Sequence, residues 1–359
     1  MNKRFFIHGS AGQRPASART IYCDGGQDDR FRPGIDLELS HWIPNQTPER
    51  YKASTSTEIC FNYIAAEGNR DDFDLVVNNH IDIDGILSLF VVLSGDAVLE
   101  HRHTIVQAAE MGDFWGWGDR PAQVLFQALT LLKNRLVLAA TDPRDVYGRC
   151  FELALQVLGG VSPPEVNEGI EALADSIRLI DSGKVVRTEI GSRFVHYAIP
   201  AAIAGWALSA CLHVPKFNAP LSGQCLLWPH ARARRDSERI QLLSVETRGG
   251  WYYDLWYPGY AWADTPALWR APGLISTGDG NVHHLDHPPL RQAAAELGKA
   301  ESARGDWTVA SKLSPFAGLT GRGFPVVLAF VKNGAPDASS LAPPFVLDRL
   351  QKAFCGESP

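Results

Sequence analysis

The clearest structural pattern of the chain is the segment FDLVVNNHIDIDGILSLFVVL, residues 73–93. Its first five residues predict a buried strand, and its last eight predict a buried helix. His80, Asp82 and Asp84 lie between them, in a turn that an open α/β sheet places at the carboxyl edge of its strands, where ligands bind. Because alternate residues of an extended segment point the same way, we expect these three side chains to converge on a divalent cation. Gly85 then permits a tight turn into the helix.

The pattern His80-x-Asp82-x-Asp84-Gly85-x-x-Ser88 resembles the first motif of the DHH phosphoesterase superfamily. The resemblance implies that this motif supplies ligands to a two-manganese centre that hydrolyses phosphodiesters or phosphoanhydrides. The Asp-His-His triplet of the superfamily is absent, and so is a Gly-Gly-Gly-His motif in the C-terminal part. The rest of the chain resembles an uncharacterised bacterial protein family for which no activity is named.

A two-metal site needs more ligands than this motif provides, and Asp113 is the next candidate. It follows a predicted helix end at Gly112, where a carboxylate can point into a cleft; the alternative is that it caps the next segment. The other dense group of ligands is Asp279–His287, with three histidines and two aspartates within nine residues. We take His284 and Asp286 from it as further metal ligands that face the same cleft. The alternative is a polar loop before a helix.

Two arginines are candidates for binding an anionic substrate. Arg322 lies in a Gly-rich segment, residues 318–323, and its planar fork suits a phosphate or a carboxylate. A hairpin turn is the alternative there, because the segment precedes a strand rather than a helix. Arg234 belongs to the one basic cluster of the chain, for which a solvated face is the alternative.

The order of the patterns predicts an α/β protein with a mostly parallel sheet and flanking helices, followed by a smaller strand-rich α+β part. We place the boundary near residue 185. This gives a DHH-like α/β domain at 1–185 and a strand-rich substrate domain at 186–359. Within the first domain, the Gly- and Pro-rich residues 1–70 predict irregular structure, with one strand at 59–63.

Charge and cysteine content restrict the partners and the compartment. The net charge is −6 and no long basic block occurs, so duplex nucleic acid is not an expected partner. The six cysteines form no Cys-x-x-Cys pair, which indicates reduced, mostly buried thiols. The most apolar segment, residues 198–212, is too short to span a bilayer, and the N-terminus has no signal-peptide pattern. We therefore expect a cytoplasmic protein without a membrane partner, and a homodimer stays open.

Together these features predict a metal-dependent hydrolase acting on a phosphoester, a phosphoanhydride or a related small anionic substrate. His80, Asp84 and Asp113 would be catalytic through a water activated by two metal ions, and manganese is the expected metal, with magnesium or zinc as alternatives. Two other readings stay open. One is a non-catalytic ligand-binding or interaction protein on a DHH-like fold, and the other is a magnesium-dependent transferase.

Overall fold

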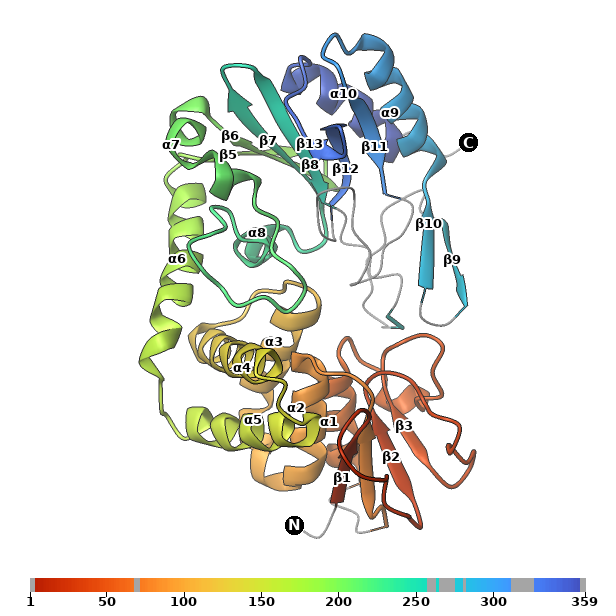
Figure 1. Cartoon of the computed structure of the whole chain (residues 1–359). Helices are drawn as coiled ribbons and strands as arrows, with labels where there is room; N and C mark the ends of the chain where they lie inside the picture. The colour runs from red at the N-terminus through yellow and green to blue at the C-terminus, as the bar shows by residue number, and fades with distance from the viewer. Residues whose placement is uncertain are drawn as a thin grey trace. The chain divides into compact units, whose positions relative to one another are not determined.

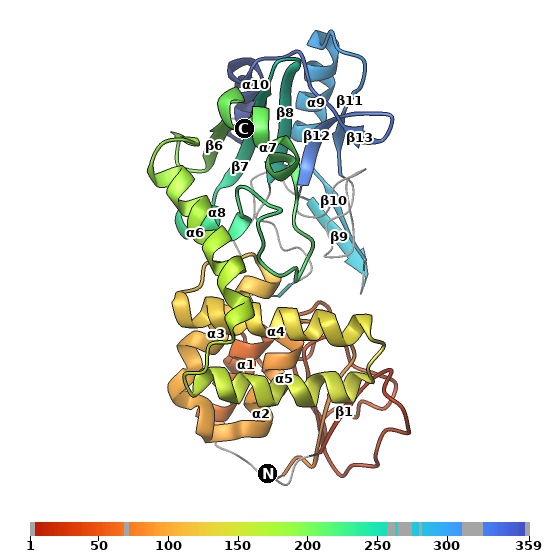
Figure 2. The same cartoon turned by 60° about the vertical axis from the view of Figure 1, so that its left-hand side comes forward.

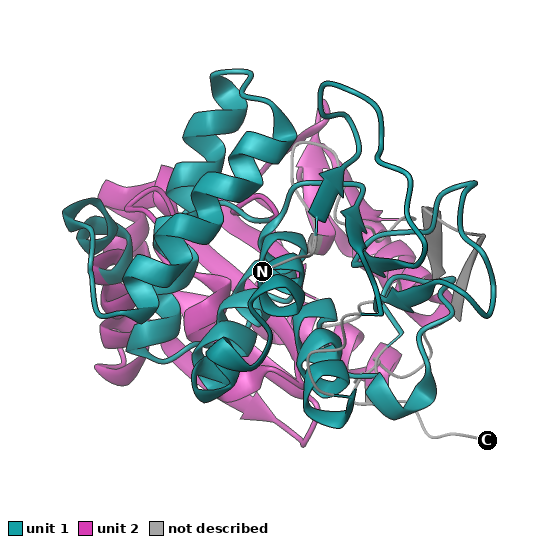
Figure 3. Cartoon of the chain, turned by 90° about the horizontal axis from the view of Figure 1, so that it is seen from below, with its two compact units in different colours: residues 1–170, 218–221, 263–268 teal, residues 171–217, 222–262, 269–359 magenta. Residues whose placement is uncertain are grey.

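The computed structural model describes residues 4–67, 72–256, 263–264, 275–279, 282–310 and 326–355. The chain divides into two compact units, which Figure 3 shows in different colours. The first unit comprises residues 1–170, 218–221 and 263–268. The second comprises residues 171–217, 222–262 and 269–359.

A four-stranded parallel sheet forms the centre of the first unit (Figure 1). Its strands, in the order β1-β4-β2-β3, are β1 (Arg4–Ile7), β4 (Leu75–Asn78), β2 (Thr20–Cys23) and β3 (Leu37–Leu39). All residues of β2 and β4 are buried, as continuous apolar strands of a covered parallel sheet should be. The carboxyl ends of β2, β3 and β4 therefore meet at one edge of the sheet.

Five α-helices complete this unit: α1 (Ser56–Glu67), α2 (Ile83–Ser94), α3 (Arg102–Asp113), α4 (Arg120–Leu138) and α5 (Pro143–Leu158). Short 3₁₀ turns accompany them: η1 (Glu49–Tyr51) precedes α1, η2 (Gly95–His101) connects α2 to α3, and η3 (Pro164–Val166) follows α5. Helices α4 and α5 pack side by side (Figure 2). Helix α2 is buried over nearly its whole length, which its uniformly apolar sequence requires.

A mixed sheet, in the order β11-β12-β8-β7-β6-β5 with β13 beside β12, forms the centre of the second unit. Its strands are β5 (Val186–Ile190), β6 (Phe194–Ile199), β7 (Ile240–Thr247), β8 (Gly250–Trp256), β11 (Asp306–Val309), β12 (Val326–Lys332) and β13 (Ala335–Pro336). Only β6 and β7 run parallel. Strands β9 (Ile275–Asp279) and β10 (Val282–Asp286) form a separate hairpin.

The helices that accompany the mixed sheet are α7 (Ala201–Leu212), α8 (Pro229–Asp236), α9 (Pro288–Ala300) and α10 (Pro343–Cys355). Helix α6 (Asn167–Asp181) begins in the first unit and continues into the second. The five cysteines whose side chains the structure describes are free and buried. Among the described residues, no helix is both long enough and apolar enough to cross a membrane.

The predicted α/β class, with a mostly parallel sheet followed by a strand-rich part, is confirmed. The prediction of irregular structure over residues 1–70 is wrong, because three of the four strands of the parallel sheet lie there. The predicted strand at 59–63 is also wrong, since these residues belong to α1. The first unit extends without interruption to Ile170, and the predicted boundary near 185 lies just before β5.

Candidate metal centre

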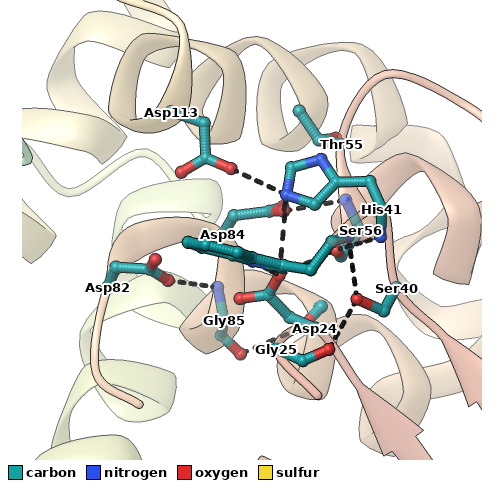
Figure 4. A network of polar contacts seen from close by, with 12 residues as sticks. Asp24, Gly25, Ser40, His41, Thr55, Ser56, Asp82, Asp84, Gly85 and Asp113 are labelled. Carbon is teal, nitrogen blue, oxygen red and sulfur yellow. Dashed lines mark hydrogen bonds and ion pairs between the residues drawn. The ribbon is translucent and has the colours of Figure 1, made fainter. Parts of the chain in front are cut away.

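The carboxyl edge of the parallel sheet collects the candidate site residues. Asp24 follows β2 directly, His41 lies two residues after β3, and His80 lies two residues after β4. Asp82 and Asp84 come from the start of α2, and all five residues belong to the first unit. Figure 4 shows Asp24 close to Ser56, with His41 on the other side of that hydroxyl.

Asp24 is the central residue of this group. It is 1% exposed and adopts a left-handed backbone conformation (φ 56°) that aspartate tolerates better than most residues. Its Oδ1 accepts hydrogen bonds from Trp42 Nε1 and from Ser56 Oγ, each at 2.8 Å. Its Oδ2 lies 2.9 Å from His80 Nε2. Every oxygen of this buried carboxylate is therefore directed by a named partner.

The first group of candidate ligands is Asp24, His80 and Asp82. His80 Nε2 lies 2.9 Å from Asp24 Oδ2 and 2.9 Å from Asp82 Oδ2. The other ring nitrogen, Nδ1, lies 2.8 Å from Asn79 Oδ1, and the amide nitrogen of Asn79 donates to the Gly26 carbonyl at 3.2 Å. That second bond orients the Asn79 amide so that its oxygen faces the ring. His80 Nδ1 consequently donates, which directs Nε2 to the two carboxylates.

The second group is Asp24, His41 and Asp84. His41 Nε2 lies 3.7 Å from Asp24 Oδ1 and 3.6 Å from Asp84 Oδ2. The Nδ1 of His41 lies 2.7 Å from the Ser54 carbonyl oxygen, which can only accept, so Nδ1 carries the proton. Nε2 is therefore the ring nitrogen that faces the carboxylate oxygens.

The backbone of α1 holds Asp84 in place. Asp84 Oδ2 accepts from the Ser56 amide at 2.7 Å, and Oδ1 accepts from the Thr57 amide at 2.8 Å. These amides lie in the first turn of the helix, where unpaired N–H groups and the helix dipole stabilise a carboxylate. Burial and the nearby Asp24 carboxylate nevertheless raise the pKa of Asp84 to about 6.

Asp113 adds a fourth carboxylate. It is 1% exposed, and its Oδ2 lies 3.4 Å from His41 Nε2. Its Oδ1 is buried and has no hydrogen-bond partner among the described residues. Burial, followed by the charge of Asp84, raises the pKa of Asp113 well above its usual range. The carboxylate makes none of the hydrogen bonds that a capping role would require.

Carboxylates outnumber cationic groups among the described residues of this cluster. Asp24, Asp82, Asp84 and Asp113 are all at least nine-tenths buried, and the groups that can oppose their charge are two imidazoles and the buried Lys133, which interacts with Asp82. Burial opposes ionisation of Asp24, yet the adjacent His80 lowers its pKa to about 2. Burial of the ring opposes protonation of His80, but the charges of Asp82 and Asp24 raise its pKa well above the usual range. Buried charges that repel one another are costly unless a cation compensates them.

The spacing of the donor atoms fits a metal ion in the first group and is slightly wider than that in the second. Ligand atoms bound at about 2.1 Å lie roughly 3.0 Å apart at right angles and roughly 3.4 Å apart in a tetrahedron. In the first group, His80 Nε2 lies 2.9 Å from each carboxylate oxygen. In the second group, the distances from His41 Nε2 are 3.6 and 3.7 Å. Mixed imidazole and carboxylate donors suit manganese, magnesium or zinc.

His80, Asp82 and Asp84 were predicted to converge on one cation, but the structure divides them between the two groups. His80 and Asp82 meet each other, whereas Asp84 lies with Asp24 and His41. The prediction assumed an extended segment, in which alternate side chains point the same way. Asp84 does not follow this pattern because α2 begins at Ile83, so Asp84 is already helical. Asp82 also has a structural task, since its Oδ1 caps α2 by accepting from the Gly85 amide at 2.7 Å.

Gly85 was predicted to permit a tight turn before the helix, but the structure gives it another role. It lies inside α2, and an added Cβ would come within 2.7 Å of Asn78 Nδ2 and 3.0 Å of Tyr147 Oη. Close packing, rather than backbone freedom, requires glycine here. Tyr147 in turn donates to the His80 carbonyl at 2.7 Å, which fixes the turn that carries the imidazole.

Sequence reasoning missed Asp24 and His41. Both follow very short strands, in the region predicted to be irregular. Asp24-Gly25-Gly26 after an apolar Ile21-Tyr22-Cys23 run was the available signal for the first, and Ser40-His41 after Leu37-Glu38-Leu39 for the second.

The remaining predicted site residues belong to the second unit. Arg234 is an exposed residue of α8 in the second unit. Arg322 and the side chains of His284 and Asp286 lie outside the described residues, although the backbone of the latter two forms β10. His287 is described: it is 5% exposed, and its Nδ1 caps α9 by accepting from the Leu290 amide at 2.9 Å.

Comparison with known proteins adds one match. No curated protein and no solved structure matches the chain. Residues 2–157 match the model of a family described as a family of unknown function (DUF6687). The matched region contains every residue of the two candidate ligand groups, and it also contains Asp113.

Proposed function

We propose that the first unit is a divalent-metal-dependent hydrolase that acts on a phosphoester, a phosphoanhydride or a related small anionic substrate. One observation carries the proposal: two histidines each direct Nε2 at buried carboxylates, and Asp24 belongs to both groups. The resemblance of residues 80–88 to the first motif of the DHH phosphoesterases supports the reaction class. Divalent cations held there would lower the pKa of a bound water and compensate the charge of a phosphate group.

The surroundings of both histidines support a role as metal ligands. A metal-binding imidazole typically donates its second N–H to an oxygen, which fixes the ring and its tautomer. Here the Ser54 carbonyl has this role for His41, and Asn79 Oδ1 has it for His80. Manganese is the expected metal, with magnesium or zinc as the alternatives.

Neighbouring residues hold the carboxylates. Trp42 and Ser56 direct Asp24 through its Oδ1, and the first turn of α1 holds both oxygens of Asp84. We assign to Asp113 the acceptance of a proton from the attacking water. Its Oδ1 suits this role, because no described donor forms a hydrogen bond with it and, unlike Asp24 Oδ2, it forms no ion pair with His80.

Elemental analysis of protein purified without chelators, paired with a panel of phosphodiester and pyrophosphate substrates, tests the proposal. We expect a bound divalent metal and metal-dependent release of phosphate or of a phosphomonoester. Asp82→Asn should lose the metal ion of the His80 group and, with it, the release of product. Asp119→Asn is the matched control, because Asp119 also caps a helix, accepting from the Ala122 amide at 3.2 Å, but lies outside both ligand groups.

Each alternative predicts a different result. Metal binding with transfer of a phosphorylated group to an acceptor, and no hydrolysis, would indicate the magnesium-dependent transferase. A protein that neither retains nor binds divalent metal would contradict the hydrolase and favour a metal-independent binding protein. If Asp82→Asn and Asp119→Asn behave alike, the acidic turn has only a structural role.

A further inference from the structure

The second unit contains a buried arginine that has no close charged partner among the described residues. Arg232, on α8, is 0% exposed. It packs against the mixed sheet, where Gln241 on β7 and Trp256 on β8 are directly paired across the strands. Side chains of paired residues lie on the same face of a sheet, so both can contact one guanidinium.

Among the described residues, the Arg232 guanidinium donates a hydrogen bond from only one of its three nitrogens. Nη1 donates to Gln241 Oε1 at 2.6 Å, and Cζ lies 4.1 Å from the centre of the Trp256 ring. Nε and Nη2 are buried and have no hydrogen-bond partner in the described part of the chain. No carboxylate oxygen described by the structure lies within 4.0 Å of these nitrogens.

Two other arginines show how the same pair of nitrogens is normally occupied. Arg187 donates to Asp236 from Nε at 2.8 Å and from Nη2 at 2.6 Å. Arg32 donates to Asp36 in the same manner, at 2.9 and 2.7 Å. The Nε–Nη2 edge is a fork that matches two oxygens of one anion. Arg232 has this edge but no described carboxylate in it.

Neighbouring acids do not fill the fork. Asp236, at the end of α8, is buried and already engaged by Arg187 and by the Tyr197 hydroxyl. Asp254 on β8 contributes only through its charge, from beyond ion-pair distance. Burial lowers the pKa of Arg232 to about 10, which reflects the cost of a charge without a close counter-charge.

We propose that Arg232 is the centre of an anion-binding site in the second unit, where its Nε and Nη2 hold two oxygens of a phosphate or carboxylate group. Trp256 stacks on the guanidinium and Gln241 fixes its orientation. The occupant is a small oxyanion or the end group of a ligand, because the guanidinium is enclosed. This site is independent of the metal centre and of the hydrolase proposal.

Thermal unfolding and calorimetric titration with orthophosphate, in chelator-treated protein at constant ionic strength, test the site. We expect phosphate to raise the Tm of the wild type and to bind with one site per chain. Acetate at the same ionic strength shows whether a carboxylate serves equally well. Arg232→Met fills a similar volume without the fork, and we expect it to weaken phosphate binding at least about tenfold.

Three variants make the outcome decisive. Arg232→Lys keeps the charge but not the bidentate edge, so it should also lose binding. Arg235→Gln removes an exposed arginine of the same helix, which pairs with Asp181, and should bind like the wild type. Asp82→Asn should retain phosphate binding even if it abolishes metal binding. An unchanged affinity in Arg232→Met, or no anion-dependent stabilisation of the wild type, would overturn the proposal.

Discussion

The Asp24→Asn substitution distinguishes a shared carboxylate from two unrelated clusters. The amide keeps an oxygen that can accept from Trp42 Nε1 and Ser56 Oγ, both at 2.8 Å in the native protein. The charge and the oxygen that faces His80 are lost. Because Asp24 belongs to both groups of three donors, each group is left with two. Asp82→Asn and Asp84→Asn each remove a donor from one group only.

The expected magnitude follows from this count. Loss of a residue that only supports a metal ligand weakens metal binding by about 10–100-fold, so loss of a direct ligand should cost at least about 100-fold. Titration of metal-free protein with Mn²⁺ in a calorimeter should show two binding events in the wild type. Asp82→Asn and Asp84→Asn should each lose one event, and Asp24→Asn should lose both. Circular dichroism should show unchanged secondary structure in each variant.

The reasoning fails if Asp24→Asn binds Mn²⁺ with the stoichiometry and affinity of the wild type while Asp82→Asn does not. That result would assign the acidic turn to a single site and leave Asp24 as a structural carboxylate. Loss of only one event in Asp24→Asn would equally refute a shared ligand.

Three further outcomes are expected. Trp42→Phe removes the indole N–H that holds the shared carboxylate, so calorimetry should show Mn²⁺ binding weakened about 10–100-fold. Gly85→Ala places a Cβ 2.7 Å from Asn78 Nδ2 and should lower the free energy of unfolding by about 1–3 kcal/mol in urea titrations. Gly148→Ala, with nothing within 4 Å of the added Cβ, should show no such loss. Burial lowers the pKa of His196 to about 4 from 6.5, so the unfolded state binds more protons between these pH values. Stability should therefore fall by about 1.4 kcal/mol per pH unit on acidification through this window, and His196→Gln should remove that slope in urea titrations at pH 5 and 7.

The sequence was informative where the structure is determined locally. Residues 73–93 contain a strand, a capped turn and a buried helix in succession, and each part has a clear pattern of its own. Hence β4, α2 and the approach of His80 to Asp82 could be predicted. The contribution of Asp84 to a different group could not, because it depends on the helix beginning at Ile83.

The missing half of the cluster depends on long-range pairing. Strands β2 and β3 are four and three residues long, too short for a periodic signal, and Gly- and Pro-rich connections flank them. β2 pairs with β4, which lies far along the chain, and β3 joins the sheet through β2. Asp24 and His41 therefore reach the site through sheet order, which no local pattern encodes.

The buried fork of Arg232 illustrates the same limit. Its sequence neighbours, Arg234 and Arg235, are exposed, as a solvated basic face predicts. Arg232 is buried instead, because α8 packs it against paired residues of β7 and β8, and the local sequence does not indicate this contact.

Anomalous scattering from crystals soaked in Mn²⁺ would locate the metal ions themselves. We expect two manganese peaks at the carboxyl edge of the parallel sheet, one beside His80 and Asp82 and one beside His41 and Asp84, with Asp24 within bonding distance of both. No manganese peak at this edge, with the carboxylates instead paired only to the two protonated imidazoles, would contradict this expectation.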